Sequence, residues 1–491
     1  MAEKIESSIK RDFRIAFIQE EMITQQGIMA LSAVLKENGF LTEVFVIQGE
    51  KDSIVDSILN YIPDIVACSV MTPGFGIAME IVNKLKAINQ KLFVIIGGPH
   101  PTFYNDIIYK EDNIDAICLG EGEHALLELC LSLQKGAVNT KIKNLWIKQN
   151  GNIVKNNLGD LVVDLDSLPI PDYDLYFRKY PVLAEREIKF IMGRGCPFNC
   201  SYCFNKDMKK LYGGDWVRFK SNKKMIKDIK EISSEYPARW ISFHDDTFNV
   251  GKKRLKAFLE LYKKEIGKPF LCRIRIDLTD EEQIELLKQA GVDKIVVGIE
   301  HGDEVFRKKM LNRDMSNKQI VKFGKWVRSR NIRLQTNNII GFPEETIDLA
   351  FSTVEINQKI KPELASAFLL NPYPGTDIYK YALETGNLID DFNIDKLTGH
   401  YCWSESVREI KSSIKNKNIN QLINLRCFFM LLVQYPWLKP IVKILILFPN
   451  NRIYEFIWQI TGVFKVSWKY SPREERRKLL SRMLKTLIRR P

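Results

Sequence analysis

Two series of short apolar runs, separated by stretches of helical periodicity, constrain the fold of this chain most strongly. In the first series the runs are RIAFIQ (14–19), EVFVIQ (43–48), DIVACSV (64–70), LFVIIGG (92–98) and AICLG (116–120). Apolar runs of this length, bounded by Gly and Pro, are typical of buried parallel strands. Five such strands with helices between them predict an α/β domain over residues 1–140, with a doubly wound, Rossmann-like parallel sheet.

The second series has six apolar runs and again alternates with helical patterns. The runs are IKFIMG (188–193), WISFHDD (240–246), FLCRIRI (270–276), KIVVGIE (294–300), RLQTNNIIG (333–341) and LASAFLL (364–370). One intervening helix, TDEEQIELLKQAG, is expected to begin with a capping box of Thr279 and Glu282 and to end at Gly291. Six βα units predict a partial, TIM-like (β/α)6 barrel over residues 186–385.

A connecting region and a C-terminal region complete the expected organisation. The segment NLWIKQNGNIVKN (144–156) predicts a β-hairpin with Asn-Gly at its turn, followed by a Pro-containing linker, within residues 141–185. Residues 386–491 are expected to be mostly helical, basic and aromatic. Lys, Arg and Pro residues interrupt the apolar stretch 426–464, so a membrane-spanning helix is not expected there.

The net charge of +13 is concentrated at the C-terminus, where residues 465–491 contain ten Lys or Arg and two Glu. Two interpretations of the C-terminal region stay open: a helical cap over the mouth of the barrel, and a membrane-surface element that binds anionic lipid. Because the basicity belongs mainly to this tail, no nucleic-acid partner is expected. The charged start, MAEKIESSIKRDF, lacks the apolar run of a signal peptide, so we expect a cytoplasmic protein, with membrane-surface association through the tail as an option.

Three of the nine cysteines, Cys196, Cys200 and Cys203, lie within eight positions of one Gly- and Pro-containing loop. A disulfide framework does not suit a large chain of this kind, and a structural zinc site would need a fourth ligand nearby. Three thiolates can hold three irons of a cubane cluster and leave the fourth iron open to an exogenous ligand. We therefore interpret the three cysteines as the ligands of a 4Fe-4S cluster.

This CxxxCxxC loop resembles that of the radical S-adenosylmethionine (radical SAM) enzymes. WISFHDDTF, IVVGIEHGDEVFRKKMLNR, IIGFPEET and NPYPGT resemble further motifs of that family, with His301 where Ser is usual. The resemblance covers residues 188–380. It implies that S-adenosyl-L-methionine binds the open iron, and that an electron from the cluster cleaves it to give a 5′-deoxyadenosyl radical.

Polar residues follow the ends of the predicted barrel strands. Because the carboxyl ends of these strands meet at one rim, Asp246, Arg275 and Glu300 are predicted to contact S-adenosylmethionine or substrate as catalytic residues. The alternative for these three is a salt-bridge network that shapes the rim without touching a ligand. In the family the backbone before the third cysteine meets the adenine, which places Tyr202 at the cofactor, although its ring suits the core equally well.

The first domain offers three loops at the ends of its strands: SVMTPGF (69–75), GGPHPTF (97–103) and GEGEH (120–124). An open parallel sheet binds ligands at this edge, and the absence of G-x-G-x-x-G after the first strand disfavours a dinucleotide. Before a radical SAM core, such a domain resembles the cobalamin-binding domain of the cobalamin-dependent branch. The resemblance implies that cobalamin contacts Thr72, Gly74, Gly97, Gly98, His100, Gly120, Glu121, Gly122 and Glu123.

The usual D-x-H-x-x-G signature is absent, so no histidine is expected on cobalt. His100 is then either a loop residue near the corrin or a side chain that stabilises the turn. A methylthiotransferase, the other family with an α/β domain before this core, would bind a second cluster there. Cys68, Cys118 and Cys130 lie in strand and helix patterns, however, and are expected to be buried apolar residues.

The sequence therefore predicts a cobalamin-dependent radical SAM enzyme that methylates an unactivated carbon of a small-molecule or lipid substrate. The alternative within the same branch is a radical cyclase or rearrangement enzyme without methyl transfer. A non-catalytic binding protein that reuses the architecture is a third hypothesis, disfavoured by the intact cysteine triplet. The implied partners are the substrate and an electron donor such as a flavodoxin or ferredoxin.

Overall fold

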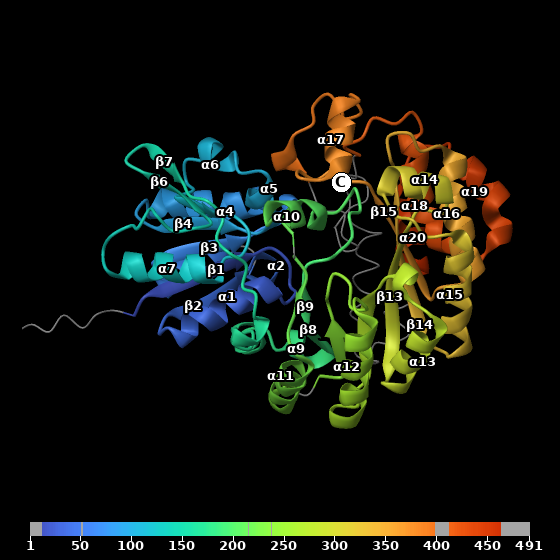
Figure 1. Ribbon diagram of the computed structural model, residues 1–491. Helices are drawn as coiled ribbons and strands as arrows, with labels where there is room; N and C mark the ends of the chain where they lie inside the picture. Colours follow the sequence, from blue (N-terminus) through green and yellow to red (C-terminus); the bar gives the residue numbers. More distant parts are fainter. Residues whose placement is uncertain (1–11, 51–52, 215, 237, 398–411, 463–491) are drawn as a thin grey trace, which may run out of the picture. The chain divides into compact units, whose positions relative to one another are not determined.

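The computed structural model describes residues 12–397 and 412–462, apart from residues 51, 52, 215 and 237. The chain divides into two compact units, residues 1–185 and 186–491 (Figure 1). We call them the first and the second unit. Within the described residues, no helix is both long enough and apolar enough to cross a membrane.

The first unit is built on a seven-stranded sheet with the order β2-β1-β3-β4-β5-β6-β7. Its parallel strands are β1 (Arg14–Gln19), β2 (Leu41–Val46), β3 (Ile65–Ser69), β4 (Phe93–Gly97) and β5 (Ala116–Cys118). The helices are α1 (Gln26–Glu37), α2 (Ile47–Glu50), α3 (Ile54–Tyr61), α4 (Phe75–Ile88), α5 (Pro99–Phe103), α6 (Ile107–Lys110) and α7 (Glu123–Gln134). The predicted doubly wound fold is confirmed, with each of the five apolar runs forming a strand.

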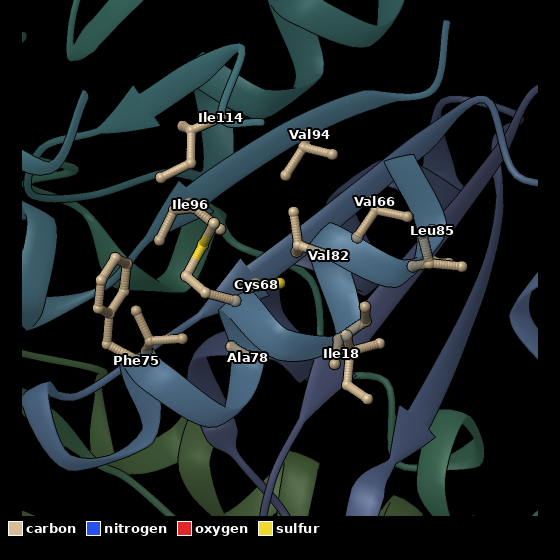
Figure 2. Packing of buried hydrophobic residues seen from close by; sticks show 14 of the residues in the cluster. Ile18, Val66, Cys68, Phe75, Ala78, Val82, Leu85, Val94, Ile96 and Ile114 are labelled. Carbon is tan, nitrogen blue, oxygen red and sulfur yellow. The ribbon is translucent and has the colours of Figure 1, made fainter. Parts of the chain in front are cut away.

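Apolar contacts between the strands and α4 make the core of this unit. Figure 2 shows Val66 and Cys68 of β3 and Ile96 of β4 packed against Val82 and Leu85 of α4, and all five are buried. Burial of a strand on both faces explains why the runs are continuously apolar rather than alternating.

The predicted hairpin is present and extends the first sheet. β6 (Leu145–Gln149) pairs antiparallel with β5 and with β7 (Asn152–Lys155). Its two-residue turn places Asn150 and Gly151 at φ of 51° and 78°, as the type I′ turn of an Asn-Gly hairpin requires. Two short helices, α8 (Asp174–Phe177) and α9 (Val182–Arg186), follow.

The second unit contains a six-stranded sheet, all parallel, with the order β15-β14-β13-β12-β11-β8. The strands are β8 (Glu187–Phe190), β11 (Trp240–Phe243), β12 (Phe270–Ile274), β13 (Val292–Glu300), β14 (Arg333–Ile340) and β15 (Leu364–Leu369). The helices are α10 (Asn205–Leu211), α11 (Asn222–Glu235), α12 (Lys252–Glu265), α13 (Glu281–Gln289), α14 (Glu304–Leu311), α15 (Asn317–Ser329), α16 (Ile347–Ile360) and α17 (Asp377–Glu384). Each of the six predicted strands is found, in the order of a partial barrel.

Strand β14 shows how the two faces of this sheet differ. Thr336 and Asn338 are buried and hydrogen-bond Asn357 of α16, at 2.6 and 2.8 Å, so this face points toward the helices. Gln335 and Asn337 alternate with them and are only partly buried. Because successive side chains of a strand point to opposite faces, these two line the inner face of the partial barrel.

The expected capping box of α13 is wrong by one residue. Asp280 is the N-cap, and its carboxylate accepts a hydrogen bond from the Gln283 backbone N–H at 2.9 Å. The Thr279 hydroxyl instead donates to the Arg275 carbonyl at 2.6 Å. A carboxylate and a hydroxyl cap a helix about equally well, so the sequence could not decide which neighbour does so.

The C-terminal region of the second unit is helical, with α18 (Ile419–Gln434), α19 (Lys439–Leu445) and α20 (Arg452–Thr461). α18 packs along β15 and α16 (Figure 1). Arg426 Nε donates to the Ala367 carbonyl of β15, which lies at the edge of the sheet. α18 therefore covers the side of the sheet and not the mouth of the barrel. The basic tail, 465–491, lies outside the described residues.

Candidate cofactor site

The loop that carries the three cysteines follows β8, and its path is fixed by close backbone packing. Asp245, just beyond β11, accepts hydrogen bonds from the backbone N–H groups of Met192 and Gly193, at 3.1 and 2.8 Å. Gly195 has a φ of 88°, and a Cβ there would lie 2.5 Å from Trp216. Burial raises the pKa of Asp245 to about 6. The loop is thus held firmly just before the first cysteine.

Cys196 and Cys203 each have a polar side chain within hydrogen-bond reach of the sulfur. Thr247 Oγ1 lies 3.4 Å from Cys196 Sγ, and Asn205 Nδ2 donates to Cys203 Sγ at 3.6 Å. Cys196 and Cys200 are buried, whereas Cys203 is partly exposed. Burial raises the pKa of Cys196, and that of Cys203 to about 12. Thiolates at these positions therefore need a cation to stabilise them.

The donor set suits a polynuclear iron cluster better than a single ion. Within the described residues, no group of three or more His, Cys, Asp or Glu side chains is placed to hold one metal ion. Cysteines of a cubane cluster bind different irons, so their sulfurs need not converge on one point. Cys196, Cys200 and Cys203 fit this requirement, because all three come from one short loop and each sulfur has a hydrogen-bond partner in reach.

Arg275, which follows β12, connects the cluster loop with the rim of the barrel. Its guanidinium makes a bidentate pair with Asp277, at 3.0 and 2.7 Å, and its NH1 donates to Cys200 Sγ at 3.3 Å. The guanidinium also stacks 3.5 Å from the ring of Phe198 in the cysteine loop. Arg275 therefore lies beside Cys200 and forms a salt bridge with Asp277, and its contact with S-adenosylmethionine or substrate stays a prediction.

Glu300 ends β13 with an unusual backbone, at a φ of 68°, beside a register shift in the β13–β14 pairing. Its carboxylate lies 3.9 Å from Arg313 and hydrogen-bonds Tyr202. Burial raises the pKa of Glu300, and the Arg313 charge partly offsets this. A Cβ at position 298 would lie 1.9 Å from the Glu300 carboxylate, so only Gly298 permits this geometry. Strain of this kind is concentrated at functional sites.

Arg313 is a site residue that the sequence analysis quoted within a motif but did not assign. It is buried and donates to the Gly298 carbonyl at 2.6 Å, to Tyr202 Oη at 3.1 Å and to Cys200 Sγ at 3.8 Å. Cys200 is therefore approached by two guanidinium groups, those of Arg275 and Arg313. The quoted segment ends in MLNR, but the partners of its arginine could not be read from spacing.

Asp246 lies next to Asp245 but in a different environment. Its side chain is exposed. Desolvation by the protein around the carboxyl nevertheless raises the pKa of Asp246, and a hydrogen bond from Asn205 partly offsets this rise. Asn205 also contacts Cys203 and accepts from Trp216 Nε1 at 2.9 Å. Asp246 is thus the accessible carboxylate at the cysteine loop, whereas Asp245 is a structural residue.

His301, which stands where the family usually has Ser, is fully buried. Its Nδ1 accepts from the Asp303 backbone N–H at 3.1 Å, and its Nε2 lies 3.3 Å from Glu345 Oε1. Its ring packs 4.3 Å from that of Phe306. His301 therefore joins the loops that follow β13 and β14 and does not face the rim.

In the first unit, the three predicted cobalamin loops follow β3, β4 and β5. Gly98 has a φ of 95°, and a Cβ there would lie 2.8 Å from the Val70 carbonyl oxygen. The Val70 N–H in turn donates to the Gly97 carbonyl at 2.9 Å. Glycine is therefore required at position 98 to pack the β3 and β4 loops together.

The Thr72 hydroxyl lies 3.1 Å from His100 Nδ1, and both residues are buried. The imidazole packs between Phe75 and Tyr104, with centroids 4.4 and 5.5 Å away, and burial lowers its pKa to about 4. Of the two roles offered for His100, this geometry favours the side chain that stabilises the loop.

The remaining predicted residues lie around the β5 loop. Gly120 has a φ of 74° and donates its N–H to Thr102 Oγ1 at 3.0 Å, while Glu121 Oε2 accepts from the Val162 N–H at 3.0 Å. Gly122 caps α7, and Glu123 is buried in its first turn. Gly74 ends the short turn before α4, close to Glu20. These residues order the edge of the sheet.

Cys68, Cys118 and Cys130 are buried, as predicted. Cys68 and Cys118 lie in strands β3 and β5, and Cys130 lies in α7. Burial raises the pKa of Cys68 and of Cys118 to about 12. They are core residues and do not form the second cluster site of a methylthiotransferase.

Comparison with known proteins finds a family match within each of the two units. Residues 190–352 match the radical SAM superfamily, and residues 20–130 match the B12 binding domain. An uncharacterised methyltransferase of Pyrococcus horikoshii is 29% identical over 76% of this chain and 81% of its own length. The anaerobic magnesium-protoporphyrin IX monomethyl ester cyclase of Rubrivivax gelatinosus is 25% identical over 83% of this chain and 74% of its own.

A solved structure of the methyltransferase TsrM from Kitasatospora setae, with cobalamin and a [4Fe-4S] cluster bound, has the same fold. It superimposes with a TM-score of 0.68 at 15% identity, covering 97% of this chain and 99% of that chain.

Proposed function

Because the chain belongs to the cobalamin-dependent radical SAM enzymes, we propose that it methylates an unactivated carbon of a small-molecule or lipid substrate. The observation that carries the proposal is the cysteine loop. Its three sulfurs are held by Thr247, Arg275 and Asn205, at the carboxyl ends of the barrel strands where such folds carry out chemistry. The similarity to a methyltransferase that spans most of this chain supports the choice of reaction.

When bound, the cluster, S-adenosylmethionine and cobalamin would supply the radical chemistry and the methyl carrier. Cys196, Cys200 and Cys203 would hold the cluster, and the two guanidinium groups at Cys200 would offset its negative charge. Cys196, Cys200 and the two guanidinium groups are buried, which limits the access of water on that side of the site, whereas Asp246 is exposed.

Two carboxylates are proposed to orient S-adenosylmethionine or substrate. Asp246 is exposed beside Cys203 and can accept hydrogen bonds from an ammonium group. Glu300, held by Tyr202 and Arg313, is less accessible, and we assign it a positioning role at the same rim.

The loops of the first unit are proposed to bind cobalamin through backbone contacts. Gly97 and Gly98 are only partly buried at the end of β4, so their backbone is open to contact from a large flat ring. Thr72 and His100 keep the β3 and β4 loops in place from the inside. We therefore propose that no histidine of this unit binds the cobalt.

A radical cyclase or rearrangement enzyme is the second candidate, and the similarity to a cyclase over most of this chain favours it specifically. Product mass separates the two: a methyl transfer adds one methylene unit, whereas a cyclisation adds none. An external one-electron donor, such as a flavodoxin or ferredoxin, is proposed for either reaction.

The first experiment is anaerobic purification, cluster reconstitution and measurement of iron and cobalamin per chain. Near-stoichiometric cobalamin that survives gel filtration, with release of 5′-deoxyadenosine from S-adenosylmethionine under reducing conditions, is the expected result. An intact cluster without cobalamin would mean that the first unit binds something else. A loaded protein that never cleaves S-adenosylmethionine would favour a non-catalytic binding protein.

A further inference from the structure

A cluster of exposed apolar side chains surrounds α19 in the C-terminal part of the second unit. Its members are exposed by between 51% and 70%: Trp437, Ile441, Ile444, Leu447 and Phe448. We call this set the α19 apolar face. Single exposed apolar residues are common on proteins, but five large ones within twelve positions indicate an interaction surface.

The orientation of α19 explains why these side chains face outward. Val442 and Ile446 are buried against the core that α18 forms with β15 and α16. Lys439 and Lys443 reach α16, where they pair with Glu355 at 2.6 Å and with Asp348 at 3.4 Å. The polar groups of α19 therefore lie along its flank, and its solvent side is left apolar, the reverse of an ordinary surface helix.

We propose that the α19 apolar face docks on an anionic lipid bilayer. Lys439 and Lys443 are paired with acidic residues of α16, but the sequence that follows α19 is basic: residues 446–491 contain eleven Lys or Arg against three Glu. Apolar side chains beside a polybasic segment provide the two signals that stable peripheral binding requires. Trp437 is well suited to the boundary between head groups and acyl chains, where tryptophan is enriched.

A second copy of the chain fits this face less well. A two-fold interface would place the same basic segment opposite itself, and like charges would repel. The bilayer proposal goes beyond the proposed methyl transfer and does not depend on it. It would bring the enzyme to the surface where an apolar substrate is dissolved.

The test measures co-sedimentation of the purified full-length protein with vesicles. Vesicles of phosphatidylcholine mixed with phosphatidylglycerol are compared with vesicles of phosphatidylcholine alone. The test variant combines Trp437→Ser, Ile444→Ser and Leu447→Ser. The matched control combines Ile88→Ser, Val163→Ser and Val305→Ser, which replaces three equally exposed apolar residues elsewhere. Circular dichroism and cobalamin content verify that each variant is folded.

We expect wild type and control to bind the anionic vesicles, more weakly at high salt, and the test variant to bind at least about tenfold more weakly. Equal binding of all three proteins would overturn the proposal. So would binding that is lost only when residues 465–491 are removed, since the tail alone would then be responsible. A dimer in light scattering that dissociates in the test variant would assign the face to self-association. Failure of any of these assays leaves the cluster and cobalamin measurements unaffected.

Discussion

Asp245 provides a direct test of how the cysteine loop is held in place. Its carboxyl is buried, Oδ1 accepts two backbone N–H bonds, and Oδ2 has no partner among the described residues. Burial raises its pKa from 3.8 to about 6. The folded protein therefore binds a proton at Asp245 more tightly than the unfolded chain does. The resulting stabilisation is complete below about pH 4 and is lost as the pH rises to about 6.

The size of the effect follows from the shift. About two pKa units at about 1.4 kcal/mol each correspond to about 3 kcal/mol in the free energy of unfolding. Asp245→Asn keeps an oxygen for the two N–H groups but cannot ionise. Relative to wild type, the variant should therefore gain about 3 kcal/mol between about pH 4 and pH 7. Any constant cost of the added amide N–H groups cancels from this difference.

The assay is urea unfolding of the cluster-free protein at several pH values, followed through the transition of the second unit. Asp391→Asn, which replaces an exposed carboxylate of the second unit, is the control. A difference between Asp245→Asn and wild type that stays constant with pH would refute the reasoning. It would mean that Asp245 has the same pKa in the folded and in the unfolded protein.

Three further predictions concern the bound groups. Cys203→Ala should lose the iron and the visible absorption of the cluster, whereas Cys272→Ala, at a buried strand position, should retain both. Gly98→Ala should destabilise the first unit by about 2 kcal/mol or more and lower its cobalamin content. Gly136→Ala, also at positive φ but with no atom within 4 Å, should leave cobalamin binding unchanged. Arg313→Gln removes a positive charge near Cys200 and should therefore make the cluster harder to reduce. An EPR-monitored redox titration should show a reduction potential lower by about 59 mV, which is a tenfold change in the equilibrium constant for one-electron reduction. An unchanged potential would exclude this role of Arg313.

Most strands of both sheets could be predicted from the sequence. Strands such as β1 and β3 are buried on both faces, so their apolar runs stand out against the helical patterns around them. The cysteine triplet was equally visible, because three ligands on one loop are close in sequence as well as in space. Finer features were not predictable, as the choice of Asp280 over Thr279 at the start of α13 shows.

Residues that act across distant loops were the hardest to assign. Arg313 reaches Cys200, Tyr202 and Gly298 only because the loops after β8 and β13 meet at one rim. The sequence left open whether His100 lies near the corrin or stabilises its turn, and the structure shows that it is buried. Burial depends on which helix covers a loop, and that is a property of the tertiary packing.

The sequence by itself determined the strands of the two α/β units and showed the cysteine triplet and the glycine loops, because periodicity, residue type and short spacing carry that information. Only the tertiary structure decided which of two adjacent carboxylates is accessible, Asp246, and which is buried, Asp245. It likewise decided that α18 covers the side of the sheet and that α19 turns apolar side chains to solvent. These outcomes depend on how elements far apart in the chain pack together, and no local pattern encodes that packing.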